Sequence, residues 1–341
     1  MRAMVCERQA KASTAPLVLL DLDDPEPGPG EVRIGVRACG VCRTDLHVVE
    51  GDLPLRSKPA IPGHQVVGLV DAVGEGTDPS WIGKRVGAAW LLETCGTCRF
   101  CGEGRENLCR KAEFLGWTRP GGFAERVCAP ADFVYELPEG FPDLQAAPLL
   151  CAGIIGYRAL SFCVDAQEEW EGLRLGLVGF GAAAHVAIQV AGARGARVTV
   201  FTRQVETRRE AALALGAVEV GELSPNNRPE GPGDLDAVVV FAPSGAVVPP
   251  SLDRLAPGGR LVLAGIHMTD TPPLPYRLLY DERRIQSVRN NTREDGRAFL
   301  AEAARIPVET RVEVFPLEAA NEALARLAEG SIQGAAVLRI G

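Results

Sequence analysis

The sequence predicts an α/β protein in which a β-rich region is followed by a doubly wound parallel sheet. From residue 1 to about 150, short strands alternate with glycine-rich turns, which is typical of a barrel-like β domain. After about residue 153, apolar strands alternate with helices, as expected of βαβ units in a parallel sheet. A chain of 341 residues also favours about two domains.

The expected elements follow this division along the chain. In the first region, apolar and polar residues alternate with period two at 32–38, which predicts a strand, and the apolar segments at 66–73 and 86–92 look like further strands. In the second region we expect four strands and two helices, at 173–178, 198–201, 236–241, 261–266, 182–193 and 206–215. After about residue 289 we expect two helices and a final strand, at 294–304, 317–328 and 335–340.

Charge and composition exclude several classes of function. The formal net charge is −8 and no stretch is basic, which argues against a nucleic-acid partner. The chain shows no signal-peptide pattern and no apolar run of membrane-spanning length, so we expect a cytoplasmic protein without a membrane partner. Ten cysteines in a reducing compartment point to metal binding or catalysis rather than to disulfides.

Four of these cysteines form a compact motif with the spacing C-x2-C-x2-C-x7-C: Cys95, Cys98, Cys101 and Cys109. Four thiolates at about 2.3 Å give a closed tetrahedral zinc site, which is structural rather than catalytic. A ferredoxin-type iron–sulfur run also begins C-x2-C-x2-C, but it continues x3-C-P. The spacing therefore favours zinc without settling the metal.

A glycine turn in the second region fits the dinucleotide-binding pattern G-x-G-x-x-(G/A). It follows a buried strand and opens an apolar helix, the context in which this pattern is credible. Gly179 permits the tight turn, and Gly181 lets a pyrophosphate approach the helix N-terminus. Ala184 is small enough for close packing of helix and strand. The alternative is a glycine turn in an α/β domain that binds no cofactor.

The residues after the second strand of this region bear on the choice of cofactor. An NAD-specific site carries Asp or Glu there to accept from the ribose 2′-hydroxyl group. The strand at 198–201 ends instead in Thr202 and Arg203. The missing carboxylate and the nearby arginine favour the 2′-phosphate of NADP, unless Arg203 is only a solvated surface charge.

A second group of candidate metal ligands is spread over the β-rich region. Cys42 lies in the sequence CGVCRTDLH, His64 in IPGH and Cys151 in LLCAGIIGYRAL. Taken singly, each could be an ordinary buried residue. Together, two thiolates and one imidazole form the open Cys2His zinc set, which leaves a fourth position for water or substrate.

With these motifs in this order, the chain resembles the zinc-dependent medium-chain alcohol dehydrogenases, and within them the bacterial propanol-preferring branch. The resemblance covers nearly the whole chain. It implies a GroES-like catalytic domain with an inserted Rossmann domain. The implied bounds are 1–152 for the zinc catalytic domain with its four-cysteine lobe at 93–111, 153–288 for the Rossmann domain, and 289–341 for the segment that returns to the catalytic domain.

The resemblance also implies roles at the metal. Cys42, His64 and Cys151 match the ligands of the catalytic zinc, whereas Cys39 occupies a non-ligand position. Asp45 matches the carboxylate that orients the imidazole of His64. The zinc would polarise the alcohol oxygen, and hydride would pass to the nicotinamide.

Further roles follow for the proton, the cofactor and the substrate. Thr44 and His47 match the relay that passes the alcohol proton to solvent by way of the cofactor ribose. Arg43 resembles the position that contacts the pyrophosphate, and Gly265 is assigned to cofactor binding. The expected walls of the substrate pocket are Leu53, Trp90 and Trp117, although Trp90 could also be core filler.

The chain departs from the family pattern at a few positions. Gln65 follows the histidine ligand where the family usually has glutamate, so a nearby negative charge is missing. Ile155 replaces a frequent threonine near the nicotinamide, and Ala335 or Ala336 stands where relatives often have arginine. The zinc ligands and the relay are all retained.

The sequence therefore predicts an NAD(P)-dependent zinc alcohol dehydrogenase with two zinc ions per chain and a small primary alcohol or aldehyde as substrate. One alternative is an NADPH-dependent cinnamyl-type aldehyde reductase. Others are a non-catalytic zinc-binding structural relative and a redox sensor based on the four-cysteine lobe. By analogy with bacterial relatives we expect a homo-oligomer, either a dimer or a tetramer.

Overall fold

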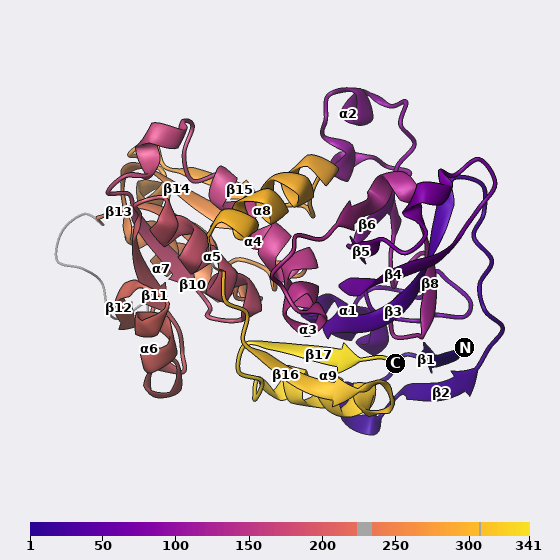
Figure 1. Ribbon diagram of the computed structural model, residues 1–341. Helices are drawn as coiled ribbons and strands as arrows, with labels where there is room; N and C mark the ends of the chain where they lie inside the picture. Colours follow the sequence, from indigo (N-terminus) through magenta and orange to yellow (C-terminus); the bar gives the residue numbers. More distant parts are fainter. Residues whose placement is uncertain (224–233, 307) are drawn as a thin grey trace. The chain divides into compact units, whose positions relative to one another are not determined.

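Figure 1 shows the computed structural model of the chain, which describes residues 1–223, 234–306 and 308–341. The described residues divide into two units. The first comprises Met1–Cys151, Asn290–Ala304 and Glu309–Gly341, and the second comprises Ala152–Arg289 and Arg305–Val308. Among the described residues, no helix combines the length and the apolar character that a membrane span requires.

The first unit is built on a mostly antiparallel sheet with the strand order β16-β17-β3-β4-β5-β9, in which β8 also pairs with β3 (Figure 1). The strands expected at 32–38 and 66–73 are β3 and β4 of this sheet, and β5 corresponds to the first part of the strand expected at 86–92. The strand bounds are β1 Arg2–Cys6, β2 Leu17–Asp21, β3 Glu31–Val41, β4 Val66–Val73, β5 Arg85–Ala88, β6 Leu91–Glu93, β7 Glu113–Phe114, β8 Arg126–Pro130, β9 Val134–Glu136, β16 Val312–Pro316 and β17 Ala335–Arg339.

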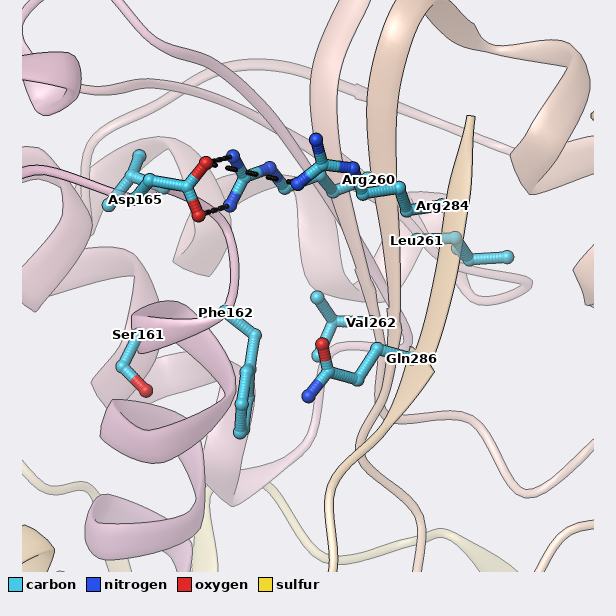
Figure 2. A pocket seen from close by; sticks show the side chains of 9 residues that line it. Ser161, Phe162, Asp165, Arg260, Leu261, Val262, Arg284 and Gln286 are labelled. Atoms are coloured by element: carbon cyan, nitrogen blue, oxygen red, sulfur yellow. Dashed lines mark hydrogen bonds and ion pairs between the residues drawn. The ribbon is translucent and has the colours of Figure 1, made fainter. Parts of the chain in front are cut away.

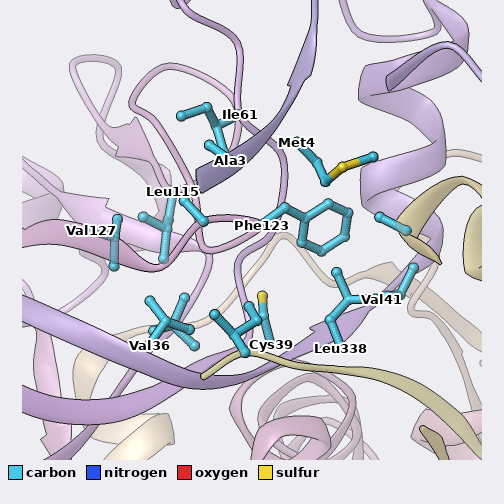
Figure 3. Close-up of a cluster of buried hydrophobic side chains, with 14 of the residues drawn as sticks. Ala3, Met4, Val36, Cys39, Val41, Ile61, Leu115, Phe123, Val127 and Leu338 are labelled. Atoms are coloured by element: carbon cyan, nitrogen blue, oxygen red, sulfur yellow. The ribbon is translucent and has the colours of Figure 1, made fainter. Parts of the chain in front are cut away.

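Apolar side chains from distant segments form the core beside this sheet. Figure 3 shows Met4, Ile61, Phe123 and Leu338 gathered with Cys39 of the central strand β3. The helices of this unit are α1 Arg43–Glu50, α2 Arg99–Gly102, α3 Asp143–Ala146, α8 Arg293–Arg305 and α9 Ala320–Glu329. Because β17 pairs with β3, the end of the chain is part of the same sheet as the first half.

Three expected elements differ in the structure. The strand expected at 261–266 is β14, which ends at Leu263, and the helix expected at 317–328 starts with a separate helical turn at Leu317–Ala319 before α9. The segment 86–92 was expected to form one strand, but it forms β5 and β6, which are separated at Ala89 and Trp90. β5 pairs with β4 and β9 in the main sheet, whereas β6 pairs with β7 in a separate two-stranded sheet. The break places Trp90 in an aromatic cluster next to His64.

The second unit contains a parallel sheet with the strand order β12-β11-β10-β13-β14-β15. This is the order of a doubly wound sheet, in which the chain starts near the middle and moves to either side. The strand bounds are β10 Arg174–Val178, β11 Arg197–Phe201, β12 Ala217–Gly221, β13 Leu235–Val240, β14 Leu255–Leu263 and β15 Arg284–Ser287. The helices are α4 Ala152–Ser161, α5 Ala182–Ala193, α6 Val205–Ala214 and α7 Val248–Asp253.

Candidate active site

Cys42, His64 and Cys151 come together in the first unit, although they are far apart in the sequence. Their ligand atoms, the two Sγ atoms and a ring nitrogen of His64, all lie within 4.8 Å of one another. The two sulfur atoms are 3.9 Å apart. Cys42 is the N-cap residue of α1 and Cys151 directly precedes α4, so each thiol lies at the end of a regular element.

Asp45 connects two of these ligands from the buried side of α1. Its Oδ2 atom accepts a hydrogen bond from the backbone N–H of Cys42 at 2.8 Å, which forms a capping box at the start of the helix. Its Oδ1 atom accepts from the backbone N–H of Gly63 at 3.0 Å and lies 3.0 Å from the Nδ1 atom of His64. A carboxylate can only accept, so Asp45 fixes the proton of His64 on Nδ1.

The backbone around His64 is fixed by a neighbouring segment. The N–H groups of Gly122 and Phe123 donate to the carbonyl groups of Gly63 and Pro62, at 2.8 and 2.9 Å. Gly63 has a φ of +100°, and a Cβ atom there would lie 2.7 Å from the backbone nitrogen of Phe123. Only glycine fits this position, which explains the glycine that precedes the histidine.

The donor set fits a zinc ion. Within the described part of the chain, the buried Nε2 atom of His64 has no hydrogen-bond partner. Burial alone would lower the pKa of His64, but the charge of Asp45 and the contact with Cys42 outweigh it and raise the pKa to about 10. The same negative surroundings that stabilise the positive charge of a protonated imidazole would also stabilise a metal cation.

The hydrogen bond between the two thiols of this site shifts their pKa values in opposite directions. Its hydrogen bond with Cys151 holds the pKa of Cys42 well below its ordinary value, although burial opposes this. The same hydrogen bond and burial raise the pKa of Cys151. The pair therefore holds one thiolate ready for a cation, and a bound cation would favour the second thiolate as well.

Cys39 lies outside this group of ligands, in agreement with the non-ligand position that the resemblance implies. It is fully buried among the apolar side chains of Figure 3, and its Sγ atom donates to the carbonyl of Gly40 at 3.6 Å. Gln65 is also buried, and its side chain lies so close to Gly40 that a Cβ atom there would be 2.8 Å from the Gln65 amide carbon.

The four cysteines of the lobe form a second group whose ligand atoms lie within 4.8 Å of one another. The Sγ atom of Cys101 lies 3.5 Å from that of Cys98 and 3.9 Å from that of Cys95, and Cys109 lies 3.6 Å from Cys95. Backbone N–H groups of Thr97 and Cys98 lower the pKa of Cys95 to about 6. Four converging sulfur atoms fit a closed zinc site.

Leu53, Trp90 and Trp117, the expected pocket walls, belong to one apolar cluster that also contains Phe114. The rings of Trp90 and Trp117 are stacked, with centroids 5.9 Å apart and an interplanar angle of 7°. The edge of Trp90 meets the ring of His64 at a centroid distance of 5.1 Å. Trp90 therefore lies next to His64, one of the candidate metal ligands.

The outer part of this cluster is polar. The Nε1 atom of Trp117 donates to the carbonyl of Pro54 at 2.8 Å, and the guanidinium of Arg56 lies 4.8 Å from the Trp117 ring centroid. These two contacts fix the orientation of the Trp117 ring.

The residues expected in the proton relay lie on α1. Thr44 is buried, and its Oγ1 atom lies 3.8 Å from the Sγ atom of Cys42. One turn further, the Nδ1 atom of His47 lies 2.7 Å from the Oδ2 atom of Asp52. Arg43, the expected pyrophosphate contact, is exposed at the first position of the helix.

The glycine turn joins β10 to α5 in the second unit. Gly179 has a φ of +90°, and a Cβ atom there would lie 3.0 Å from the backbone nitrogen of Ala242. Gly181 is the N-cap residue of α5, and a Cβ atom there would meet no described atom within 4 Å. The chain itself does not need a glycine at this position, so the open space fits a phosphate at the helix N-terminus. Ala184 is fully buried.

The remaining cofactor positions also lie at the carboxyl ends of parallel strands. Thr202 and Arg203 follow β11, and Gly265 follows β14. The hydroxyl oxygen of Thr202 accepts from the backbone N–H of Gln204 at 3.2 Å, while Arg203 is exposed. Ligands of doubly wound sheets bind at this edge.

A cavity of about 120 Å³ in the second unit contains none of the expected site residues. Figure 2 shows that Asp165 and Arg260 are paired among the side chains that line it. Both carboxylate oxygens of Asp165 accept from this guanidinium, one of them at 2.9 Å.

Taken together, an open Cys2His metal site, a closed four-cysteine site and a dinucleotide turn on a doubly wound sheet define a zinc-binding dehydrogenase. Two family models match the chain: the alcohol dehydrogenase GroES-like domain at residues 28–139 and the zinc-binding dehydrogenase at residues 183–305. The chain is 47% identical to the probable alcohol dehydrogenase AdhA of Mycobacterium tuberculosis, over 100% of this chain and 97% of that protein. It belongs to the zinc-dependent medium-chain alcohol dehydrogenases.

Solved structures agree with this assignment. A cinnamyl alcohol dehydrogenase of Sorghum bicolor matches with a TM-score of 0.89 and 29% identity, covering 99% of this chain and 97% of that one. An acetophenone reductase of Geotrichum candidum in complex with NAD matches with a TM-score of 0.88 and 28% identity, covering 99% and 96%. The predicted fold class is confirmed, as is the predicted enzyme class, an NAD(P)-dependent zinc alcohol dehydrogenase.

The sequence did not reveal every residue that contributes to the site. Asp52 was not anticipated as the partner of His47, and Phe114 and Phe133 were not anticipated in the aromatic cluster. No local pattern marks Phe114 or Phe133. A carboxylate five positions after a relay histidine was the one available signal for Asp52.

Proposed function

We propose that the enzyme oxidises small primary alcohols, or reduces the corresponding aldehydes, at the Cys42, His64 and Cys151 site. The observation that carries this proposal is the buried Nε2 atom of His64, which lacks a partner among the described residues while Asp45 fixes the proton on Nδ1. This arrangement prepares the imidazole as a metal ligand next to two thiols.

When bound, zinc would polarise the oxygen of the alcohol, and the nicotinamide would accept a hydride from the alcohol carbon. The chain supplies orientation, exclusion of water and the proton path. Asp45 keeps the proton of His64 on Nδ1, and the ring of Trp90 packs against the imidazole ring in a T-shaped arrangement. In this proposal the hydroxyl of Thr44 accepts the alcohol proton as it gives up its own proton towards the cofactor ribose, and His47, oriented by Asp52, would take a proton from the ribose and release it to solvent.

For the substrate we favour a small primary alcohol. Trp90 lies next to His64 and stacks on Phe114 and Trp117, and large rings beside a metal ligand support a short aliphatic chain as substrate. The second candidate is a cinnamyl-type aldehyde. It is supported by the structural likeness to the Sorghum bicolor enzyme and by an aromatic wall on which an aryl group can stack.

For the cofactor, we propose that the enzyme uses NADP at least as efficiently as NAD. The strand β11 ends in Thr202 and Arg203, without the carboxylate that would accept from a ribose 2′-hydroxyl group and repel a 2′-phosphate. The guanidinium of Arg203 is exposed, so it is accessible to a phosphate. Gly179, Gly181 and Gly265 would contact the pyrophosphate and nicotinamide ends of the cofactor.

We also propose that the enzyme is a homo-oligomer, either a dimer or a tetramer. β15 is the edge strand of the parallel sheet, and all four of its residues are exposed. Ile285 on this strand and Tyr276 and Tyr280 before it are exposed apolar side chains, with Tyr276 at 74%. An exposed edge strand with apolar neighbours favours pairing with a second copy.

A reducing compartment such as the cytoplasm suits this chemistry. Cys42 and Cys151 approach each other to 3.9 Å, as do members of the four-cysteine lobe. Sulfur atoms this close would be exposed to oxidation in a disulfide-forming compartment, and the zinc ligands would be lost.

The decisive experiment is a panel of alcohols and aldehydes assayed separately with NAD and NADP on protein of known zinc content. The proposal expects the highest kcat/KM for short primary alcohols. Higher values for cinnamyl substrates would favour the second candidate. Absence of turnover with every alcohol and aldehyde, on protein that holds both zinc ions, would contradict both.

A further inference from the structure

An ion pair with a buried carboxylate connects the four-cysteine lobe to the aromatic cluster. Glu106 lies in the short helical turn Glu106–Leu108 that directly precedes Cys109, and it is only 6% exposed. A carboxylate so deeply buried needs a partner that offsets the cost of its lost hydration. That partner is Arg293, which lies 187 residues further along the chain.

Arg293 approaches the Oε1 atom of Glu106 with two donors. Its backbone N–H donates at 3.0 Å and its Nε atom at 3.3 Å. Arg293 is the first residue of α8, so this backbone N–H is one of those that a helix leaves without an internal partner. Thr292 and Asp295 form a capping box at the same helix end. Glu106 thus adds a favourable negative charge at the N-terminus of α8.

The side chain of Arg293 also contacts the aromatic cluster. Its guanidinium lies 4.5 Å from the ring centroid of Phe133. Phe133 is buried together with Trp90 and Phe114, and the edge of Trp90 contacts His64. The ion pair therefore joins the lobe to the apolar cluster whose rings line the proposed substrate pocket.

The geometry points to Arg293 and Glu106 as positioning residues that set substrate selectivity: they hold Phe133, and through it Phe114 and Trp90, in place beside His64. Neither residue needs to touch the substrate. The inference rests on the proposed function for its kinetic consequence, because it assumes that Trp90 lines the alcohol pocket. Its structural part, the packing of the rings, can be measured without turnover.

The first variant to test is Arg293→Met. Methionine retains the backbone N–H and similar bulk but removes the cation over Phe133 and the Nε hydrogen bond. The free energy of a cation–π contact, which depends on its burial, corresponds to about a two- to thirtyfold change in an equilibrium constant, and this range sets the limits for the change in KM. We expect KM to change about three- to tenfold for branched or aryl alcohols and to stay nearly constant for ethanol, with kcat almost unchanged. Arg293→Lys, which retains the cation, should restore most of the selectivity.

The spectroscopic measurement uses the stacked indoles of Trp90 and Trp117. Two nearly parallel rings 5.9 Å apart couple their electronic transitions, which gives a paired band in circular dichroism. If Phe133 shifts in Arg293→Met or Glu106→Ala, the angle between the indoles changes and the band weakens. This readout needs no substrate, so it separates failure of the positioning role from failure of the proposed activity.

The chain offers a matched control. Arg326 pairs with Glu313 at 2.6 Å and lies 5.5 Å from the ring centroid of Phe315, in a different apolar cluster. Arg326→Met removes the same kinds of contact and should lower thermal stability without changing the selectivity or the indole band. If Arg293→Met behaves like Arg326→Met, losing stability but keeping the KM ratio and the band, then Arg293 is merely structural and the inference is overturned.

Discussion

The Nδ1 atom of His64 lies 3.0 Å from the Oδ1 atom of Asp45, and the same carboxylate accepts the backbone N–H of Cys42 at 2.8 Å. Asp45 thus fixes the ring of one metal ligand and the helix start that carries another. The motifs CGVCRTDLH and IPGH are coupled through this one side chain, which explains why the metal site needs both.

Replacing Asp45 with asparagine should weaken zinc binding and turnover together. The variant retains an acceptor for Nδ1, but it loses the negative charge and turns an N–H group towards the N–H of Cys42. Loss of such a partner typically costs about 10–100-fold in metal affinity or activity. The measurement is zinc competition with a chelator, alongside kcat. Asp71→Asn, at an exposed carboxylate of β4 that pairs with Arg33, is the control and should change neither.

Metal analysis should return two zinc ions per chain, because two separate groups of ligand atoms converge. Cys151→Ala should lose one equivalent and all turnover while the lobe zinc remains. Cys95→Ala should lose the other equivalent and mainly lower the temperature of unfolding, since structural zinc contributes directly to folding. A single equivalent on fully loaded wild-type protein would eliminate one of the two sites.

His47→Ala should slow turnover by about 100-fold or less, since a relay step lies at the low end of general acid–base effects. The effect should be greatest below neutral pH, where exogenous bases are scarce, and added base should partly restore the rate. Asp52→Asn should give a smaller decrease, because Asp52 orients the ring of His47. Kinetics that stay unchanged across the pH range would exclude His47 from the rate-limiting proton path.

Much of the fold was accessible from the sequence because its signals are local. The helix at 182–193 and the strand at 66–73 have the bounds expected from periodicity. The separation of β5 from β6 was not accessible, since 86–92 reads as one apolar run and the two halves differ only in their distant partners. The edge strands β12 and β15 were not predicted, since neither is a continuous buried apolar run: two of the five residues of β12 and all four residues of β15 are exposed.

The candidate metal ligands could be predicted from the sequence for a different reason. Cys42 and Cys151 lie 109 residues apart, so no spacing rule joins them, and only the combination of motifs and the family resemblance did so. The pairing of Glu106 with Arg293 could not be predicted from the sequence. Both are ordinary charged residues, and their contact depends on how α8 packs against the four-cysteine lobe.

The Glu106–Arg293 pair should make stability depend on pH in the acid range. Burial alone would raise the pKa of Glu106, but the N–H groups and the charge of Arg293 outweigh it and lower the pKa. A lowered pKa contributes stability that is fully present above the unfolded value of about 4.3 and is lost as the pH falls through the folded value.

Glu106→Gln should therefore destabilise the protein at neutral pH by about 1–2 kcal/mol, since Arg293 is partly exposed and the pair is partly screened. The difference between wild type and variant should shrink below about pH 4. Denaturant unfolding at a series of pH values measures both quantities. A difference that stays constant down to acid pH would mean that the charge of Glu106 does not contribute.

The residues after β11 should decide the choice of cofactor. Thr202 and Arg203 follow this strand at the carboxyl edge of the parallel sheet, where a doubly wound fold binds the adenosine ribose. Threonine cannot repel a 2′-phosphate, and the exposed guanidinium of Arg203 can pair with it through two donors. We therefore expect wild-type kcat/KM with NADP to equal or exceed that with NAD.

The test compares kcat/KM for both cofactors in the wild type, Thr202→Asp and Arg203→Ala. An aspartate at 202 should repel the phosphate, and a charge-assisted contact of roughly 1.5–3 kcal/mol corresponds to a swing of about ten- to a hundredfold towards NAD. Arg203→Ala should lower kcat/KM for NADP alone, because only NADP carries the phosphate that this side chain would contact. Arg209→Ala, at an exposed arginine on α6, is the control and should leave the ratio unchanged. A wild type that strongly prefers NAD, with Arg203→Ala neutral for both cofactors, would show that Arg203 is only a solvated surface charge.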